Sequence, residues 1–315
     1  CQDRLNVLRP LIHKTYFDEE KKTYKADRQS YLVIALYSGV VPAALRPVIM
    51  KQLEDDIVVK HNGHLDTGMQ GTYMLLDLLK QENRNDLAAR ITSQTTYPGW
   101  GFLVKERKVT TWPEIWDGWG SQTILSRTTP EAWFYEGLAG IRPDPAAPAF
   151  KKIIIKPAIV GDVTWVKCSY NSIHGRIVSN WKREGNKLTM EVTIPPNTTA
   201  TVYVPAKDQK DVTERGKPAG KAEGVKFLKT ENGAAVYEVG SGSYSFYVSE
   251  TKHEYYVSPS GSDSNKGTLA AHAEPQKRES GTGGMAPLFL AGPKENSGHQ
   301  NSRATVRARQ ESFSH

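Results

Sequence analysis

The chain has 315 residues, a formal net charge of +7 and two cysteines, and this length suggests two domains with room for a sizeable core. No run of about eighteen apolar residues occurs, so the sequence predicts no transmembrane helix and no membrane partner. Basic and acidic residues are interleaved along most of the chain, which argues against a nucleic-acid partner. Two cysteines are too few for a disulfide framework, and no Cys/His cluster has the spacing of a zinc site.

The first part of the chain, residues 1–145, has the apolar spacing of helices. Leu5, Leu8 and Leu11 already belong to a helical pattern, so we expect the sequence to begin inside a domain. Apolar residues that recur every three or four positions predict four further helices, over 43–60, 71–82 and 86–93 and from Pro130 onward. The segment 97–120 is rich in Trp and Gly and lacks helical periodicity, which predicts a long functional loop.

The second part, residues 146–250, changes to a period of two. Short strands are predicted over 152–157, 188–194 and 244–248, with turn residues between them. Regularly spaced short strands of this kind predict an antiparallel β-sandwich. Residues 251–315 are mostly Gly, Ser, Ala and charge without periodicity, and we expect a largely disordered tail.

One segment places two carboxylates, Glu114 and Asp117, among the tryptophans Trp112, Trp116 and Trp119. Hydrolysis of a glycosidic bond needs a proton donor together with a base or a nucleophile, usually a pair of carboxylates. Aromatic rings pack against the C–H faces of sugars, and burial beside such rings raises the pKa of a carboxyl group. The alternative is that the tryptophans belong to the core and the acids cap helices.

Two more loops carry carboxylates. Asp66 and Thr67 lie in a Gly-flanked loop before an apolar helix, where the alternative is simple N-capping of that helix. Asp18 follows Tyr16 and Phe17, with Gln29 further on, and the alternative here is a surface hairpin.

Other chemistries find no support in the residues. His61 and His64 lie three positions apart without enough neighbouring ligands for a metal ion. No glycine-rich phosphate loop follows a strand, and no serine lies in a Gly-x-Ser-x-Gly elbow. Cys168 falls in a predicted strand, which indicates a packing role and not a nucleophile.

Taken in order, these motifs resemble those of the bacterial α-L-rhamnosidases, which are six-hairpin glycosidases. The resemblance is carried by Thr-Thr-Trp-Pro-Glu-Ile-Trp-Asp-Gly at 110–118 and by the segments at 16–18, 29, 64–72, 96–101 and 132–141. Segments 170–175, 179–181 and 194–202 resemble the C-terminal β-domain of the same family. The resemblance covers about residues 1–248.

The resemblance implies the C-terminal part of an (α/α)6 barrel over 1–145, followed by the antiparallel β-sandwich. It implies inverting hydrolysis of terminal α-L-rhamnosides without a cofactor or a metal, with a rhamnose-containing glycan or glycoside as the partner. Glu114 would be the general base that activates water. The residues that would bind the sugar are Trp112, Trp116, Asp117, Asp66, Thr67 and Trp100.

Two departures from the family pattern bear on activity. The family's general acid falls upstream of Cys1, and nothing in residues 1–60 replaces it. A sugar-contacting histidine that usually follows the Glu114 motif is absent from residues 121–127. We therefore expect the chain to be part of a rhamnosidase that is inactive, or nearly so, alone. A non-catalytic carbohydrate-binding protein and a six-hairpin glycosidase with another sugar preference remain alternatives, and the residues assign no cellular compartment or oligomeric state.

Overall fold

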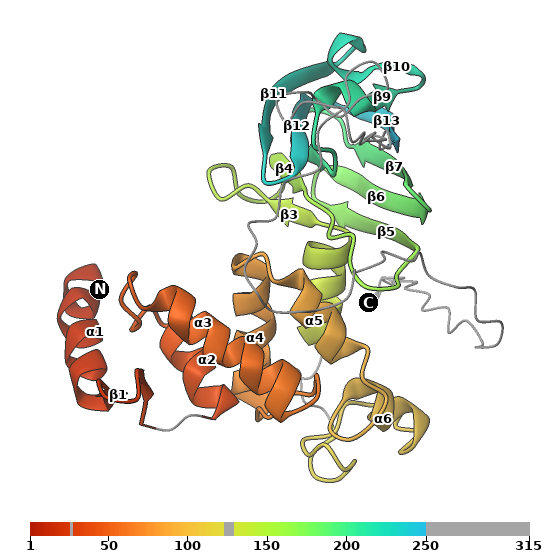
Figure 1. Cartoon of the computed structure of the whole chain (residues 1–315). Helices are drawn as coiled ribbons and strands as arrows, with labels where there is room; N and C mark the ends of the chain where they lie inside the picture. The colour runs from red at the N-terminus through yellow and green to blue at the C-terminus, as the bar shows by residue number, and fades with distance from the viewer. Residues whose placement is uncertain (26–27, 123–128, 250–315) are drawn as a thin grey trace, which may run out of the picture. The chain divides into compact units, whose positions relative to one another are not determined.

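A computed structural model describes residues 1–25, 28–122 and 129–249 (Figure 1). The predicted tail over 251–315 lies outside the described residues. Within them, the α-helices and π-helical turns extend as far as Leu138, and the strands of two larger sheets begin at Ile141, with two short 3-10 turns, η4 (Gln209–Asp211) and η5 (Ala219–Lys221), among them. No helix in this described part is both long enough and apolar enough to span a bilayer.

The helical part confirms the helices predicted from apolar spacing. Its helices are α1 (Gln2–Tyr16), α2 (Gln29–Tyr37), α3 (Arg46–Asp55), α4 (Met69–Gln81), α5 (Asn85–Thr92), α6 (Trp100–Lys105) and α7 (Thr129–Trp133), with π-helical turns η1 (Asp56–Lys60) and η3 (Phe134–Leu138) continuing α3 and α7. A short antiparallel hairpin joins β1 (Phe17–Asp18) to β2 (Thr23–Tyr24). The pattern predicted over 43–60 therefore corresponds to α3 and η1 together.

Helix α4 lies at the centre of the helical packing. Leu75, Leu76, Leu78 and Leu79 are almost completely buried, and α4 contacts α2, α5 and α7 (Figure 1). Burying each such side chain contributes about 1.5–3 kcal/mol. The four leucines therefore fix α4, and with it the loop that leads into α4.

Two features of the helical part differ from the expectations. Helix α6 lies inside the segment predicted as loop, because six residues are too few to show helical periodicity. Its Gly101 passes so close to the preceding loop that a Cβ atom there would lie 2.5 Å from the carbonyl oxygen of Gln94. Helix α1 is helical as predicted, but it buries none of its residues, and Leu5, Leu8 and Leu11 are exposed.

Two sheets make up the second part. The six-stranded sheet has the order β10-β9-β13-β7-β6-β5, and the five-stranded sheet has the order β11-β12-β8-β4-β3. Their strands are β3 (Ile141–Pro143), β4 (Lys152–Ile155), β5 (Trp165–Ser172), β6 (Gly175–Glu184), β7 (Lys187–Ile194), β8 (Thr199–Val204), β9 (Val212–Glu214), β10 (Lys217–Pro218), β11 (Val225–Glu231), β12 (Ala234–Val239) and β13 (Gly242–Ser249). The β4–β8 pair is parallel, while β5, β6 and β7 form an antiparallel meander.

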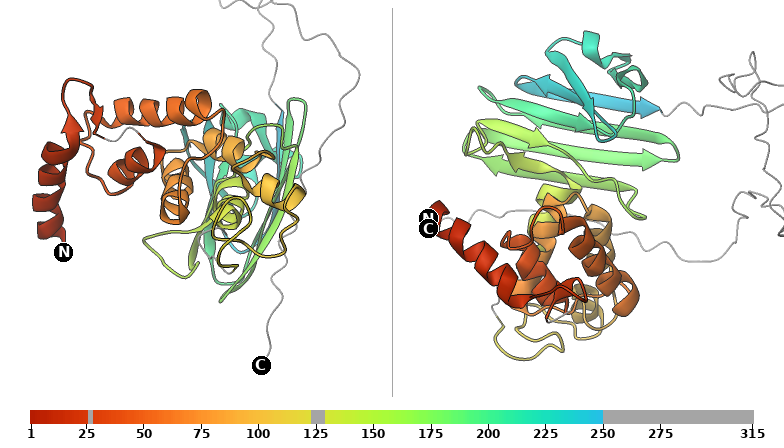
Figure 2. Two further views of the ribbon diagram at one scale, coloured as in Figure 1. Left: turned by 90° about the horizontal axis from the view of Figure 1, so that it is seen from below. Right: turned by 60° about the vertical axis from the view of Figure 1, so that its left-hand side comes forward.

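The strands of the two sheets lie together in one β part of the molecule (Figure 2). Their side chains belong to one buried core, as the expected sandwich requires. Tyr237 of β12 stacks on Phe246 of β13 with ring centroids 5.7 Å apart, and both side chains are fully buried. Along β7, residues 188, 190, 192 and 194 are buried in alternation, as predicted. Cys168 is buried on β5, and burial raises the pKa of its thiol to about 11, so the thiol stays protonated at neutral pH.

Buried hydrogen bonds tie the six-stranded sheet to the end of η3. Trp181 on β6 donates from Nε1 to the carbonyl oxygen of Leu138 at 2.8 Å, and Ser179 donates from Oγ to the carbonyl oxygen of Ala139 at 2.6 Å. Gly140 follows with a φ of +72°, and its carbonyl accepts the N–H of Lys156 at 2.9 Å. A Cβ atom at Gly140 would lie 2.1 Å from the backbone of Lys156, so only glycine fits at this junction.

Replacing Trp181 tests this junction. Trp181→Phe keeps an aromatic ring but leaves the buried carbonyl of Leu138 without its donor, and we expect the free energy of unfolding in urea to fall by about 1–3 kcal/mol. Trp119→Phe is the matched control, because Trp119 is 72% exposed, and it should change stability by less than about 0.5 kcal/mol. Equal stability of the two variants would contradict the role given to Trp181.

Candidate functional site

A buried glutamine organises the loop before α4. Gln29, the first residue of α2, is completely buried. Its Oε1 accepts the backbone N–H of Asp66 at 2.8 Å, while its Nε2 donates to Oδ1 of Asp56 at 3.1 Å and to the carbonyl oxygen of His64 at 3.4 Å. One carboxamide thus connects α2, η1 and the loop at 61–67. Sequence reasoning noted Gln29 but assigned it no role.

The next residues of this loop meet the Trp-rich segment. Trp116 donates from Nε1 to the carbonyl oxygen of Thr67 at 3.3 Å, and its ring packs edge-on against Trp100 with centroids 5.1 Å apart. The hydroxyl of Thr72 donates to the carbonyl of Gly68 at 2.9 Å, which leaves its oxygen to accept the hydroxyl of Thr67 at 2.9 Å. Both indoles and both threonines are buried, so this corner is rigid.

The N-capping alternative for the loop is not observed. Helix α4 begins at Met69 with Gly68 at its N-cap and has no side-chain cap. The hydroxyl of Thr67 is hydrogen-bonded to that of Thr72, and its carbonyl accepts the indole N–H of Trp116. The carboxylate of Asp66 lies 3.6 Å from Nε2 of His61. Neither side chain caps the N-terminus of α4.

These elements surround a hollow of about 670 Å³. Its wall includes Arg28, Tyr31, His61, Asp66, Thr67, Tyr97 and Trp116. Tyr31 and Tyr97 are 53% and 57% exposed, so their rings are available at the surface. Exposed aromatic rings beside a carboxylate and a guanidinium form a surface that suits a polyhydroxylated ring, which offers apolar C–H faces and hydroxyl groups.

Glu114 lies two residues from Trp116 but is not among the residues that line this hollow. It is exposed, its Oε2 accepts the N–H of Ser121 at 3.3 Å, and its own N–H donates to the carbonyl of Ser121 at 2.7 Å. Asp117 is half-buried and accepts the N–H of Trp119 at 3.3 Å, and Trp112 packs partly buried against the core. The structure therefore brings part of the predicted site together and leaves four of its residues outside the wall: Glu114, Trp112, Asp117 and Trp100.

Four of the predicted residues lie together. Asp66, Thr67 and Trp116 form the wall, and Trp100 supports Trp116 from behind. Glu114, Trp112 and Asp117 belong to the adjoining turn. Among the described residues, no group of three or more His, Cys, Asp or Glu side chains could hold a metal ion.

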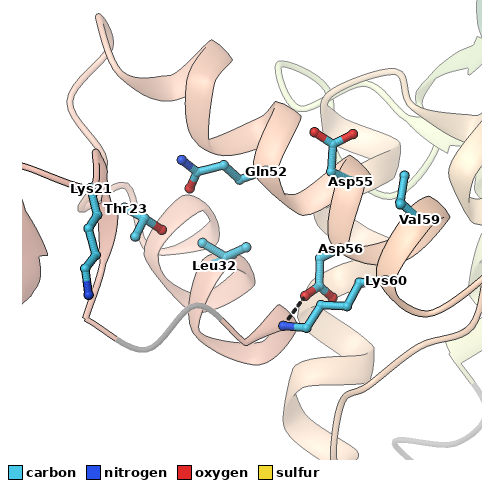
Figure 3. A pocket seen from close by; sticks show the side chains of 8 residues that line it. All are labelled: Lys21, Thr23, Leu32, Gln52, Asp55, Asp56, Val59 and Lys60. Atoms are coloured by element: carbon cyan, nitrogen blue, oxygen red, sulfur yellow. Dashed lines mark ion pairs between the residues drawn. The ribbon is translucent and has the colours of Figure 1, made fainter.

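A second hollow, also of about 670 Å³, lies between the β1–β2 hairpin and α3 with η1 (Figure 3). Lys60 pairs there with Oδ2 of Asp56 at 3.3 Å. Gln52 donates to the carbonyl of Lys22 at 2.9 Å. No aromatic ring is among the described residues that line this hollow, and these residues offer no surface on which a sugar would stack. Asp56 lines this second hollow, with Oδ2 toward Lys60 and Oδ1 toward Gln29.

The Asp18 loop is the surface hairpin given as its alternative. Oδ1 of Asp18 accepts the N–H groups of Glu20 and Lys21, each at 3.0 Å. The N–H of Lys21, more than any other group, lowers the pKa of Asp18. The carboxylate closes the turn and is not part of either wall.

Most residues of the wall are not among the predicted binding residues. The sequence analysis considers His61 only as a metal ligand, and it assigns no binding role to Arg28, Tyr31 or Tyr97. An aromatic residue on the outer face of an otherwise apolar helix, as Tyr31 is on α2, was a usable signal, because a core helix has no packing reason to expose one.

Comparison with known proteins agrees with this arrangement. Residues 2–136 match the family described as bacterial alpha-L-rhamnosidase 6 hairpin glycosidase domain, and residues 140–219 match the family described as bacterial alpha-L-rhamnosidase C-terminal domain. The chain belongs to the bacterial α-L-rhamnosidase family. The two matches meet where the helices end at Leu138 and the strands begin at Ile141.

Individual relatives support the assignment. An alpha-L-rhamnosidase of Streptomyces avermitilis is 33% identical over 259 residues, which cover 78% of this chain and 24% of that protein. Another, from an Alteromonas species, is 29% identical, over 61% of this chain and 22% of that protein. This rhamnosidase homologue therefore spans about a quarter of the length of the curated relatives it matches.

Solved structures give the same result. The structure of the Streptomyces avermitilis enzyme complexed with L-rhamnose matches with a TM-score of 0.68 and 30% identity, over 78% of this chain and 24% of that one. The alpha-L-rhamnosidase from Dictyoglumus thermophilum matches with a TM-score of 0.67 and 30% identity, over 77% and 28%. The helical part and the β part are thus both built as in rhamnosidases.

Removing the carboxamide of Gln29 tests how the wall is held. Gln29→Leu leaves the buried N–H of Asp66 and the acceptors on Asp56 and His64 without their partner, so the free energy of unfolding should fall by about 2–3 kcal/mol. The amide of Asp66 should also exchange its hydrogen faster. Gln70→Leu, at an exposed position of α4, is the control, and an equally small effect at both positions would refute the role of Gln29.

Proposed function

We propose that this chain forms one side of the active site of an α-L-rhamnosidase that removes terminal rhamnose from glycans or glycosides. The hollow walled by Asp66, Thr67 and Trp116 holds the sugar ring. The observation that carries the proposal is Trp116, which lies in the wall of the hollow only two residues after Glu114. The binding surface and the candidate base are thus on one short segment.

Glu114 acts in this proposal as the general base. Its carboxylate is exposed, so water reaches it, and the N–H of Ser121 orients one of its oxygens. In inverting hydrolysis, a base removes a proton from water while an acid on the opposite face of the sugar protonates the leaving oxygen, with the two carboxyl groups about 6.5–9.5 Å apart. Substrate bound against Trp116 would bring the sugar to the segment that carries Glu114.

The general acid in this mechanism comes from outside these 315 residues. Among the described residues, Asp66 is the one carboxylate that lines the hollow; it faces His61 and belongs to the same wall as Trp116, not to an opposing one. The curated relatives are about four times as long as the matched region, which leaves ample chain to supply an acid. Trp112 and Asp117 serve the same site by shaping the turn that presents Glu114.

The proposed architecture follows the same division. Residues 1–145 contribute the C-terminal part of an (α/α)6 barrel, and residues 146–250 form the C-terminal sandwich. Helical structure gives way to sheet between η3, which ends at Leu138, and β3, which begins at Ile141, and this supports a division of the chain a few residues before 145. A purely sugar-binding protein and a glycosidase for another sugar find no support among the relatives, which are named as rhamnosidases.

Glu114→Gln tests the proposed base. In the complete enzyme, this change removes the proton acceptor but keeps the shape, so kcat on p-nitrophenyl α-L-rhamnoside should fall about 10²- to 10⁴-fold with little change in KM. Glu131→Gln, at an exposed glutamate of α7, should leave both constants unchanged. Retention of kcat in Glu114→Gln would remove Glu114 from the mechanism.

The 315-residue chain by itself tests the origin of the acid. We expect it to bind L-rhamnose without hydrolysing p-nitrophenyl α-L-rhamnoside, because it supplies a base and no opposing acid. Release of p-nitrophenol in the absence of any other polypeptide would show that these residues contain both groups.

A further inference from the structure

The imidazole of His61 lies between two carboxylates in the wall of the sugar hollow. Its Nδ1 is 3.0 Å from Oδ1 of Asp56 and 3.0 Å from the main-chain oxygen of the same residue. Both oxygens are acceptors, so in the neutral imidazole the proton is on Nδ1 and Nε2 carries a lone pair. Asp56 is itself fixed, because Gln29 and Lys60 hold its two carboxylate oxygens.

The bare Nε2 of His61 faces Oδ2 of Asp66 at 3.6 Å. With His61 neutral and its proton on Nδ1, these are two acceptors with no hydrogen between them, and no described residue donates a hydrogen bond to this Nε2. The side chains are 25% and 51% exposed, and both line the hollow. Two such acceptors in the wall of a hollow can accept hydrogen bonds from the donor groups of a ligand.

His64, three residues further on, shows the contrast. Its Nδ1 donates to the carbonyl of His61 at 2.9 Å, and its Nε2 lies 2.7 Å from the hydroxyl of Thr96, which donates to it. Both nitrogens of His64 are therefore used within the protein, and His64 does not line the hollow. One imidazole has a structural role, while the other keeps an acceptor directed at the site.

We infer that His61 is a sugar-binding residue, whose Nε2 accepts one ring hydroxyl of the terminal sugar while Oδ2 of Asp66 accepts its neighbour. Acceptors 3.6 Å apart can each take a hydroxyl at about 2.8 Å. The inference rests on the proposed function, because it requires a sugar in this hollow. It gives Asp66 and His61 a joint role in selecting sugars with adjacent free hydroxyls.

The test uses the 315-residue chain with ¹⁵N-labelled histidine, titrated with L-rhamnose. Before addition, Nε2 of His61 should resonate as an unprotonated nitrogen, and L-rhamnose should move this resonance in the direction of an accepted hydrogen bond. Unlabelled variants, followed by tryptophan fluorescence, give the affinity: His61→Phe should weaken binding about three- to tenfold, because one hydrogen bond is lost. His174→Phe, in the β5–β6 turn of the sandwich, is the matched control and should bind as the parent does.

The outcomes separate the two proposals. If the parent chain binds no L-rhamnose, the proposed function fails and the inference fails with it. If the parent binds but Nε2 of His61 does not shift, or is protonated throughout at neutral pH, the role of His61 is wrong while the sugar site remains. The NMR measurement on the parent needs no variant, so a misfolded His61→Phe would not leave the question open.

Discussion

The buried carboxamide of Gln29 is the interaction on which the rest of the site depends. It is one of the few polar side chains that the described core encloses completely, and a buried amide is costly unless its hydrogen bonds are made. Satisfying it fixes the backbone of Asp66, the carbonyl of His64 and the carboxylate of Asp56 in one arrangement. The loop that forms the wall of the hollow is therefore attached to α2 and η1 rather than free to move.

From this anchor the wall is built outward in two directions. Along the chain, Thr67 follows Asp66 and receives the indole N–H of Trp116, which brings in the Trp-rich segment. Through Asp56, the anchor orients His61 so that one nitrogen faces the protein and the other faces the hollow. Rigid positioning of this kind reduces the entropy lost when a ligand binds, which is why a polar network deep in the helices matters for a site at the surface.

Much of the fold follows from local sequence pattern. Long elements with a clear period, such as α4 and β7, were predictable because burial imposes a spacing on their apolar residues. Helix α6 was not, because a six-residue helix has no period to detect. The hydrogen bonds from Trp181 and Ser179 to the end of η3 could not be predicted from local pattern either, because they join residues about forty positions apart.

The site was predictable in part for the same reasons. Asp66, Thr67, Trp100 and Trp116 were selected by chemistry and motif, and the fold does bring them together. The positions of Glu114 and Asp117 depend on the hydrogen bonds of an irregular turn. A turn of this kind has no periodic sequence pattern from which its geometry could be predicted. His61 could not be recognised from sequence, because its role depends on which nitrogen meets Asp56, and only three-dimensional distances show that.

A crystal structure of this chain soaked with L-rhamnose would test the central claim, that the hollow beside Trp116 is the sugar site. We predict density for one pyranose ring against the aromatic wall, with ring hydroxyls within hydrogen-bond distance of Asp66 and His61. Sugar bound only at another surface, with the hollow holding nothing but solvent at saturating L-rhamnose, would contradict the claim.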